Sequence, residues 1–259
     1  MRLPKQPHLT MPNSLRASTL ALLCLALFGC AAAPAKRDPR DPWERMNRTT
    51  YQFNDKFDKA IARPVAHTYI RITPQPVRTG VSNFIDNLTY PITIINDFLQ
   101  AKFVQGLQDT GRLVMNTTVG LAGFKDPASQ AGLDKHDEDF GLTLGHWGLH
   151  PGPYLVIPFL GFSDVRDGFG RLADIYTTPT HYIRNTTASW SLWAVEVLDT
   201  RARLVSSEGL LDSAFDPYAF TRNAYLARRH YLITGESEEP ELEDDDTGDD
   251  SAPAAPPKQ

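Results

Sequence analysis

The feature that most constrains the fold of this chain is a stretch without charged side chains at residues 140–163. Its length and apolar character would suit a membrane span, which needs about 20 apolar residues. Five glycines and three prolines interrupt it, however, and each interior proline removes a backbone donor and disrupts helical geometry. Irregular backbone cannot face lipid hydrocarbon, because its polar groups would lack partners. We therefore predict a Gly/Pro-rich apolar loop that lies in a protein core, or against lipid with its backbone satisfied elsewhere.

The aromatic residues of this stretch suit either environment. Rings of this kind settle at membrane interfaces, and they also pack in hydrophobic cores. The rings concerned are Trp147, Tyr154, Phe159 and Phe162. Both interpretations therefore stay open until the rest of the chain is considered.

Residues 1–29 have the pattern of a bacterial lipoprotein signal peptide. Basic residues precede an apolar run at residues 20–28, which is too short to span a membrane. The segment ends in Gly29-Cys30, a small residue directly before a cysteine. This is the lipobox pattern, in which the cysteine thiol accepts a diacylglycerol before cleavage. We therefore predict that Cys30 is the lipidation site, and that residues 30–40 form a lipidated tether.

The residues that follow the predicted lipidation site indicate a destination. Three alanines come directly after Cys30, and the second position of the mature chain is not aspartate. This favours the outer membrane of a Gram-negative bacterium, with the protein anchored by lipid on the periplasmic side. Cys24 is the only other cysteine and lies within the signal peptide, so the mature chain has no thiol for a disulfide or a metal.

Charge divides the chain unevenly. Residues 235–259 hold ten acidic residues, one lysine and no aromatic residue, which predicts a disordered acidic tail. Because the whole chain carries a net charge of −5, the remainder is close to neutral and gives no case for binding nucleic acid. The tail can serve solubility, or it can bind a basic partner.

Residues 41–234 read as a series of short amphipathic helices. Four predicted helix starts place a capping residue directly before proline: Asp41-Pro42, Thr73-Pro74, Asp126-Pro127 and Asp216-Pro217. Strand signals are poor, and only Leu155-Val156-Ile157 resembles a short strand. We therefore predict an all-α bundle that forms a single domain over these residues.

Two of these helices carry clear apolar faces. Phe53, Phe57 and Ile61 recur at helical spacing, opposite a charged face. This helix can pack on a core or lie in a membrane surface, and it is our candidate membrane-contact helix. Residues 187–204 form the most regular helix, with Trp190 and Trp193 on its apolar face. Because each short helix can bury one face only, some aromatic residues are expected to face lipid.

Candidate catalytic and metal sites are weak. The run from His136 to Asp139 resembles a metal cluster, but adjacent side chains do not converge, so a solvated acidic loop is the preferred interpretation. His146 and His150 have the spacing of helical zinc ligands, yet Gly148 lies between them and no glutamate follows the first histidine. We therefore predict no metal, no cofactor, no catalytic residue and no enzyme activity.

Several runs of residues resemble the VacJ/MlaA lipoprotein family. They extend over residues 41–231 and include Asn47-Arg48-Thr49, Arg63-Pro64-Val65, Pro74-Gln75-Pro76, Ser82-Asn83-Phe84, Thr143-Leu144-Gly145-His146, Gly152-Pro153-Tyr154, Arg166-Asp167 and Asp216-Pro217-Tyr218. Trp147, His150, Pro151 and the acidic tail depart from the family pattern.

This resemblance implies a ring-shaped helical lipoprotein embedded in the periplasmic leaflet of the outer membrane and associated with a trimeric porin. Such a protein removes mislocalised glycerophospholipids from the outer leaflet through a central channel and passes them to a soluble periplasmic carrier. The result is maintained lipid asymmetry, and no bond is made or broken.

Several residues are candidates for the lipid channel or for a gating loop. They are Phe140, Gly141, Gly145, His146, Trp147, Gly152, Tyr154, Arg166, Asp167 and Asp174. For the charged residues among them, and for Arg171, the alternative is a set of structural ion pairs. Two other functions stay open: a scaffolding lipoprotein that moves no lipid, and a membrane-bound phospholipid hydrolase centred on His146 or His136.

Overall fold

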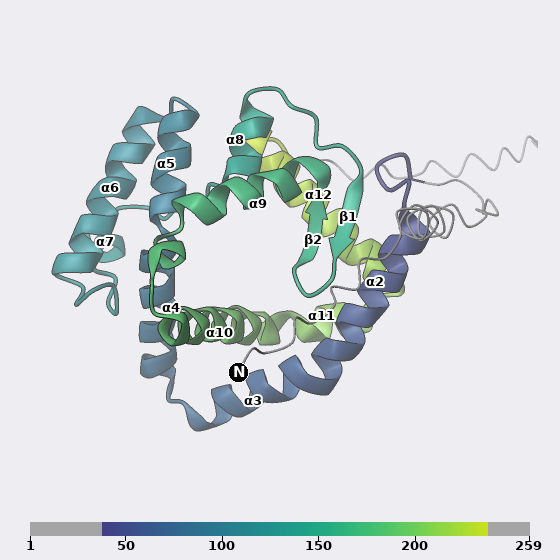
Figure 1. Cartoon of the computed structure of the whole chain (residues 1–259), viewed down its shortest axis with the longest axis horizontal. Coiled ribbons are helices and arrows are strands. Elements are labelled where there is room, and N and C mark those ends of the chain that lie inside the picture. Colours follow the sequence, from purple (N-terminus) through teal and green to yellow (C-terminus); the bar gives the residue numbers. More distant parts are fainter. Residues whose placement is uncertain (1–37, 238–259) are drawn as a thin grey trace, which may run out of the picture. The chain divides into compact units, whose positions relative to one another are not determined.

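The computed structural model describes residues 38–237, and Figure 1 traces their helices and strands. The predicted signal peptide, Cys30, nearly all of the tether and residues 238–259 of the tail lie outside the described residues. The described residues from Arg40 onward form one unit.

The described chain is mainly helical, which confirms the predicted class in its coarser form. The α-helices are α2 (Glu44–Phe57), α3 (Arg63–Ile72), α4 (Gln75–Thr89), α5 (Pro91–Leu99), α6 (Phe103–Thr118), α7 (Pro127–Gln130), α8 (Phe140–His146), α9 (Val165–Thr177), α10 (Thr186–Arg203), α11 (Glu208–Ser213) and α12 (Pro217–Thr234). A π-turn, η1 (Asp58–Ala62), joins α2 to α3, and 3₁₀ turns occur at η2 (Pro179–Tyr182) and η3 (Leu204–Ser207). No helix among the described residues is long and apolar enough to cross a membrane.

Residues 140–163 are not the continuous loop that the sequence predicts. They begin with helix α8 and end in an antiparallel hairpin of β1 (Tyr154–Ile157) and β2 (Gly161–Asp164), in which Tyr154 pairs with Asp164. The helix forms because the Asp139 side chain accepts a hydrogen bond from the backbone N–H of Leu142 and so caps its first turn. The short strand predicted around Val156 is confirmed.

Two of the four predicted helix starts are capped as expected. Asp126 accepts a hydrogen bond from the N–H of Ser129, and Asp216 accepts from the N–H groups at the start of α12. Asp41 has a different role, because α2 begins later, at Glu44, without a side-chain cap. The Asp41 carboxylate is instead fully buried, and it accepts hydrogen bonds from Asn47 and from the Tyr218 hydroxyl.

Contacts between elements follow a circuit that returns to its start. Each element touches the next in the order α2, η1, α3, α10, α4, α5, α9, β2, β1 and again α2 (Figure 1). Elements that are far apart in the sequence, such as α3 and α10, are therefore neighbours. The hairpin closes the circuit by packing against α2.

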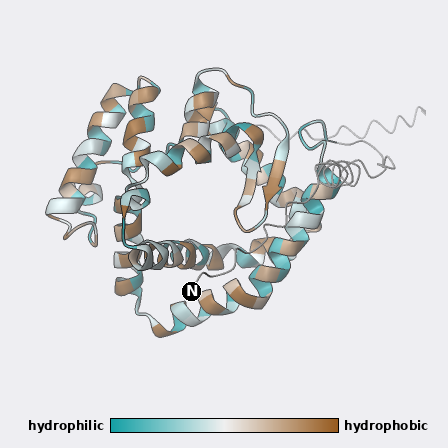
Figure 2. Cartoon of the chain, in the orientation of Figure 1, coloured by the Kyte–Doolittle hydropathy of each residue, from teal (hydrophilic) through white to brown (hydrophobic). Residues whose placement is uncertain are grey.

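Burial is inverted relative to an ordinary water-soluble domain. Among the described residues, buried polar and charged side chains outnumber buried hydrophobic ones, whereas large hydrophobic side chains are exposed on most of the helices. Figure 2 shows hydrophobic and hydrophilic residues interleaved along these helices. Exposed apolar side chains in this number are typical of proteins that contact a membrane or a protein partner.

Candidate functional site

The predicted membrane-contact helix is the first part of a longer exposed stripe. Phe53, Phe57 and Ile61 are 48%, 38% and 52% exposed, and the stripe continues to Val65 on α3. Positions four residues apart drift by about 40° around an ideal α-helix. The π-turn η1 takes up one additional residue and so offsets much of this drift. The stripe therefore stays on one side of the bent helix.

The hairpin turn lies against this stripe. The Phe159 ring contacts Phe53 and Phe57 edge-on, with centroids 5.2 Å and 5.1 Å apart. The Asn54 amide donates to the carbonyl of Ile157 at 3.0 Å and accepts from the N–H of Phe159 at 2.9 Å. Phe159 has a positive φ of 62°, which is strained for a residue with a side chain. Asn54 therefore fixes the hairpin turn on α2.

Replacing Asn54 with leucine is expected to release the hairpin turn. The change removes both hydrogen bonds, each of which contributes about 0.5–1.5 kcal/mol, so the expected loss is about 1–3 kcal/mol. Hydrogen exchange at the Phe159 amide should accelerate by about ten- to a hundredfold. Gln52→Leu, at an exposed position of α2, is the matched control. Unchanged exchange at Phe159 would show that the turn does not depend on Asn54.

Helices α8 and α9 cross at glycines. A Cβ atom placed on Gly170 would lie 2.4 Å from the backbone nitrogen of Gly141, and one placed on Gly145 would lie 2.6 Å from the Ile233 side chain. Gly141 and Gly145 therefore serve close packing. Gly152 differs, because its φ of 71° favours glycine at the turn that enters β1.

A buried ion-pair network joins α8, α9 and α12. Arg229 binds Asp139 through both terminal nitrogens, at 2.5 Å and 2.9 Å, and its Nε lies 2.6 Å from Asp167. Arg166 Nη2 lies 2.9 Å from Asp167, and the Tyr225 hydroxyl donates to Asp167 at 2.5 Å. Burial raises the pKa of Asp167, but the charge of Arg229 and the Tyr225 hydrogen bond outweigh it and hold the pKa below its ordinary value.

This network bears on the predicted polar lining. Arg166 and Asp167 are buried, and each forms an ion pair within the network. This arrangement matches the alternative of structural ion pairs and not an open polar lining. Asp174 accepts hydrogen bonds from the Phe140 N–H, and burial raises its pKa to about 6. Arg171 is exposed and donates to a carbonyl of β2 at 2.6 Å. These charged residues hold elements together.

The remaining candidates occupy two different environments. Tyr154 is fully buried and packs against the rings of Tyr218 and Tyr225. His146 and Trp147 are exposed at the end of α8, where the Trp147 indole donates to a carbonyl of α5 at 3.1 Å. The structure therefore brings exposed aromatic and imidazole groups together at this end of α8, beside α5.

One interpretation from the sequence is wrong. The run from His136 to Asp139 is not a solvated loop, because Glu138 is buried and bound by Lys102 at 2.7 Å, while His136 lies 3.0 Å from the buried Asp109. No group of residues in the described part of the chain has the arrangement of a metal site. The apolar face predicted for residues 187–204 lies on α10 and is exposed, since Trp190 and Trp193 are 63% and 52% exposed.

Comparisons with known proteins identify the family. The model of the family described as "MlaA lipoprotein" matches residues 39–232. The "Intermembrane phospholipid transport system lipoprotein MlaA" of Escherichia coli K12 is 39% identical over 230 residues, which cover 85% of this chain and 90% of the relative. The protein of the same description from Haemophilus influenzae is 30% identical over 224 residues, covering 83% and 89%.

A solved structure is also similar to this chain. It is described as "Structural basis for maintenance of bacterial outer membrane lipid asymmetry", with a TM-score of 0.68 and 37% sequence identity. The match covers 76% of this chain and all of the solved chain. Sequence and structure agree over the helical unit that carries the inverted burial. The chain belongs to the MlaA lipoprotein family.

Proposed function

We propose that this chain is an outer-membrane lipoprotein of intermembrane phospholipid transport. It removes mislocalised glycerophospholipids from the outer leaflet and passes them to a soluble periplasmic carrier, which maintains lipid asymmetry. The relatives from E. coli and H. influenzae are described as lipoproteins of such a transport system. The family is not enzymatic, and the hydrolase alternative is set aside.

The inverted burial is the observation that carries this proposal. Apolar surface in water costs about 25 cal/mol per Å², and hydrocarbon removes that cost. Helix α5 has nine residues and is therefore about 14 Å long, close to half of the hydrocarbon core of about 30 Å. A helix of this length with an exposed apolar face suits one leaflet, and we place the helical unit in the periplasmic leaflet, anchored through Cys30.

The route for lipid follows from the circuit of elements. A charged headgroup is costly to leave unpaired in hydrocarbon, so a transport protein has to offer polar and apolar surfaces together. A closed circuit of amphipathic elements supports a ring with a central channel. In this scheme Arg166 and Asp167 fix α9, one element of the ring, to α12, whereas His146, Trp147 and the hairpin are the candidate gating elements. A trimeric porin is the proposed partner in the membrane.

Photocrosslinking in intact cells tests contact with lipid. A benzophenone side chain in place of Trp193 is expected to capture radiolabelled phospholipid, because this position lies on an exposed apolar face. The same group in place of Asp137 is the control, since that exposed side chain pairs with Arg228 on a charged surface. Capture at Trp193 well above that at Asp137 supports the proposal. Equal capture at the two positions would contradict immersion of α10 in lipid.

A further inference from the structure

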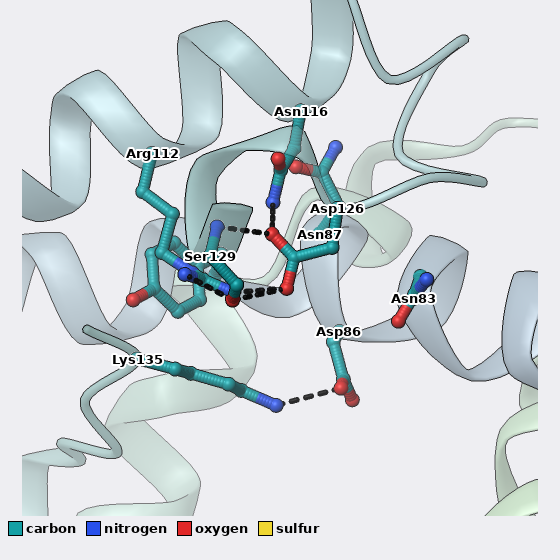
Figure 3. Close-up of a pocket in the computed structure, with 9 residues that line it drawn as sticks. Asn83, Asp86, Asn87, Arg112, Asn116, Asp126, Ser129 and Lys135 are labelled. Carbon is teal, nitrogen blue, oxygen red and sulfur yellow. Dashed lines mark hydrogen bonds and ion pairs between the residues drawn. The ribbon is translucent and has the colours of Figure 1, made fainter. Parts of the chain in front are cut away.

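A polar pocket lies outside the elements assigned to gating. It opens between α4, α6 and the segment around α7, whose lining side chains Figure 3 shows. Its volume is about 170 Å³, more than a single water molecule needs, so it can admit a small polar group. Its walls carry two carboxylates, Asp86 and Asp126, and two cations, Arg112 and Lys135.

The inner ion pair is structural. Arg112 binds Asp126 at 2.6 Å, and it also donates to the Leu133 carbonyl at 2.6 Å and to the Ser129 hydroxyl at 3.0 Å. The Arg112 side chain is 5% exposed. Its donors are engaged in joining α6 to the following segment, so this pair forms the fixed wall of the pocket.

The charged residues at the rim of the pocket are accessible to solvent. The Asp86 carboxylate binds Lys135 at 2.6 Å and Arg203 at 2.8 Å, and both cationic side chains are more than 40% exposed. Burial raises the pKa of Asp86, but the hydrogen bonds from Arg203 and Lys135 outweigh it and keep the pKa below its ordinary value. One carboxylate therefore lies between two solvent-facing cations. This rim can exchange its internal ion pairs for a ligand that carries both signs of charge.

Apolar surface borders the polar pocket. Asn83 lines the pocket and donates to the backbone carbonyl of Phe124 at 3.4 Å. The Phe124 ring stacks on Phe84 at 4.9 Å and is half exposed, and Val119 and Leu121 are exposed on the same loop. A headgroup in the pocket would have apolar surface for the first part of its acyl chains beside it. This combination is the one that an amphipathic lipid requires.

From this geometry we propose that the pocket binds the headgroup of a zwitterionic aminophospholipid. The phosphodiester accepts hydrogen bonds from Lys135, and the ammonium group donates to Asp86. The charges of the four pocket side chains cancel, and Arg203 at the rim is balanced by its second partner, Asp199, at 2.7 Å. The pocket therefore favours a neutral headgroup over an anionic one. This inference rests on the proposed transport function and adds a headgroup preference to it.

Binding of short-chain lipids to the purified full chain in detergent tests the pocket. The probes are dihexanoyl phosphatidylethanolamine, dihexanoyl phosphatidylglycerol and inorganic phosphate, followed by calorimetry. The ethanolamine lipid is expected to bind most tightly. Lys135→Gln should weaken it by about tenfold, the effect of losing one charge-assisted hydrogen bond. Lys125→Gln removes an exposed lysine that does not line the pocket, and should change nothing.

Asp86→Asn separates binding of the ammonium group by Asp86 from binding of the phosphodiester by Lys135. It is expected to weaken binding of the ethanolamine lipid, because the ammonium group loses its acceptor. It should strengthen binding of the glycerol lipid, because Lys135 loses its carboxylate partner while Arg203 keeps only Asp199. Inorganic phosphate binding as tightly as the lipids would overturn the proposal in favour of a simple anion site. Equal binding by wild type and Lys135→Gln, with thermal unfolding unchanged, would also overturn it. Either result would leave the proposed transport function intact, because that function is tested separately by the amount of surface phospholipid in cells.

Discussion

Replacing Arg229 with methionine is expected to lower the free energy of unfolding by about 3–5 kcal/mol, the usual cost of removing one partner of a buried ion pair. The pair of Arg229 with Asp167 is buried, with side chains 13% and 4% exposed, whereas Asp139, the second partner of Arg229, is 39% exposed. Asp139 also caps α8, and Asp167 lies on α9, so the loss reaches two helices. Denaturant unfolding in a mild detergent measures the change.

The neighbouring residue provides the control. Arg228 forms an ion pair with Asp137 at 2.8 Å, but the two side chains are 66% and 75% exposed. Exposed pairs contribute about 0–1 kcal/mol, so Arg228→Met should leave stability nearly unchanged. A similar loss in both variants would show that the network around Arg229 does not stabilise the fold.

Asp97→Asn is expected to make the protein more stable at pH 8. Asp97 is fully buried, and burial together with the neighbouring Asp109 raises its pKa to about 7. One carboxylate oxygen of Asp97 is without a hydrogen-bond partner, while the other accepts from Gln105 at 2.7 Å. The structure therefore favours a proton on Asp97. Asparagine supplies a neutral side chain of the same shape, with an N–H donor in place of that proton.

The pH dependence follows from the direction of this shift. A carboxyl group whose pKa is higher in the folded state favours folding fully below its unfolded pKa of about 3.8, and this contribution is lost as the pH rises through about 7. At about 1.4 kcal/mol per pKa unit, the loss is on the order of 4 kcal/mol above pH 7. Asp97→Asn should therefore match wild type near pH 4 and exceed it at pH 8.

Other charged groups around Asp97 define the control. Glu138 and Asp109 are the neighbouring carboxylates, His136 pairs with Asp109, and Lys102 pairs with Glu138. Asp137 lies between His136 and Glu138, and its carboxylate is exposed. The Asp137→Asn variant should show wild-type stability at both pH values. Equal stability of Asp97→Asn and wild type at pH 8 would mean that Asp97 is ionised without cost in the folded protein.

Local sequence patterns predicted much of the secondary structure. Asp126 and Asp216 cap their helices because capping needs only neighbouring backbone donors. The sequence did not predict α8, whose glycines suggested a loop, because those glycines serve contact with α9 and α12. Asp41 failed as a cap for a similar reason, since its partners Asn47 and Tyr218 are fixed by tertiary packing.

The candidate site was less predictable from sequence than the helices. Periodicity identified the apolar face of α10, but it does not say whether protein or lipid covers that face. The exposure of Trp190 and Trp193 could therefore be established only from the structure. The roles of Arg166 and Asp167 depend on Tyr225 and Arg229, which lie on α12, far along the chain. Only the folded chain brings these groups together.

Surface-accessible phospholipid in whole cells tests the central claim most directly. Cells that lack this protein should expose more phospholipid in the outer leaflet, and complementation with the full chain should reverse the increase. Complementation with Cys30→Ser, which removes the predicted lipidation site, should fail. Unchanged surface phospholipid in the cells that lack the protein would contradict the transport account and would favour a scaffolding lipoprotein.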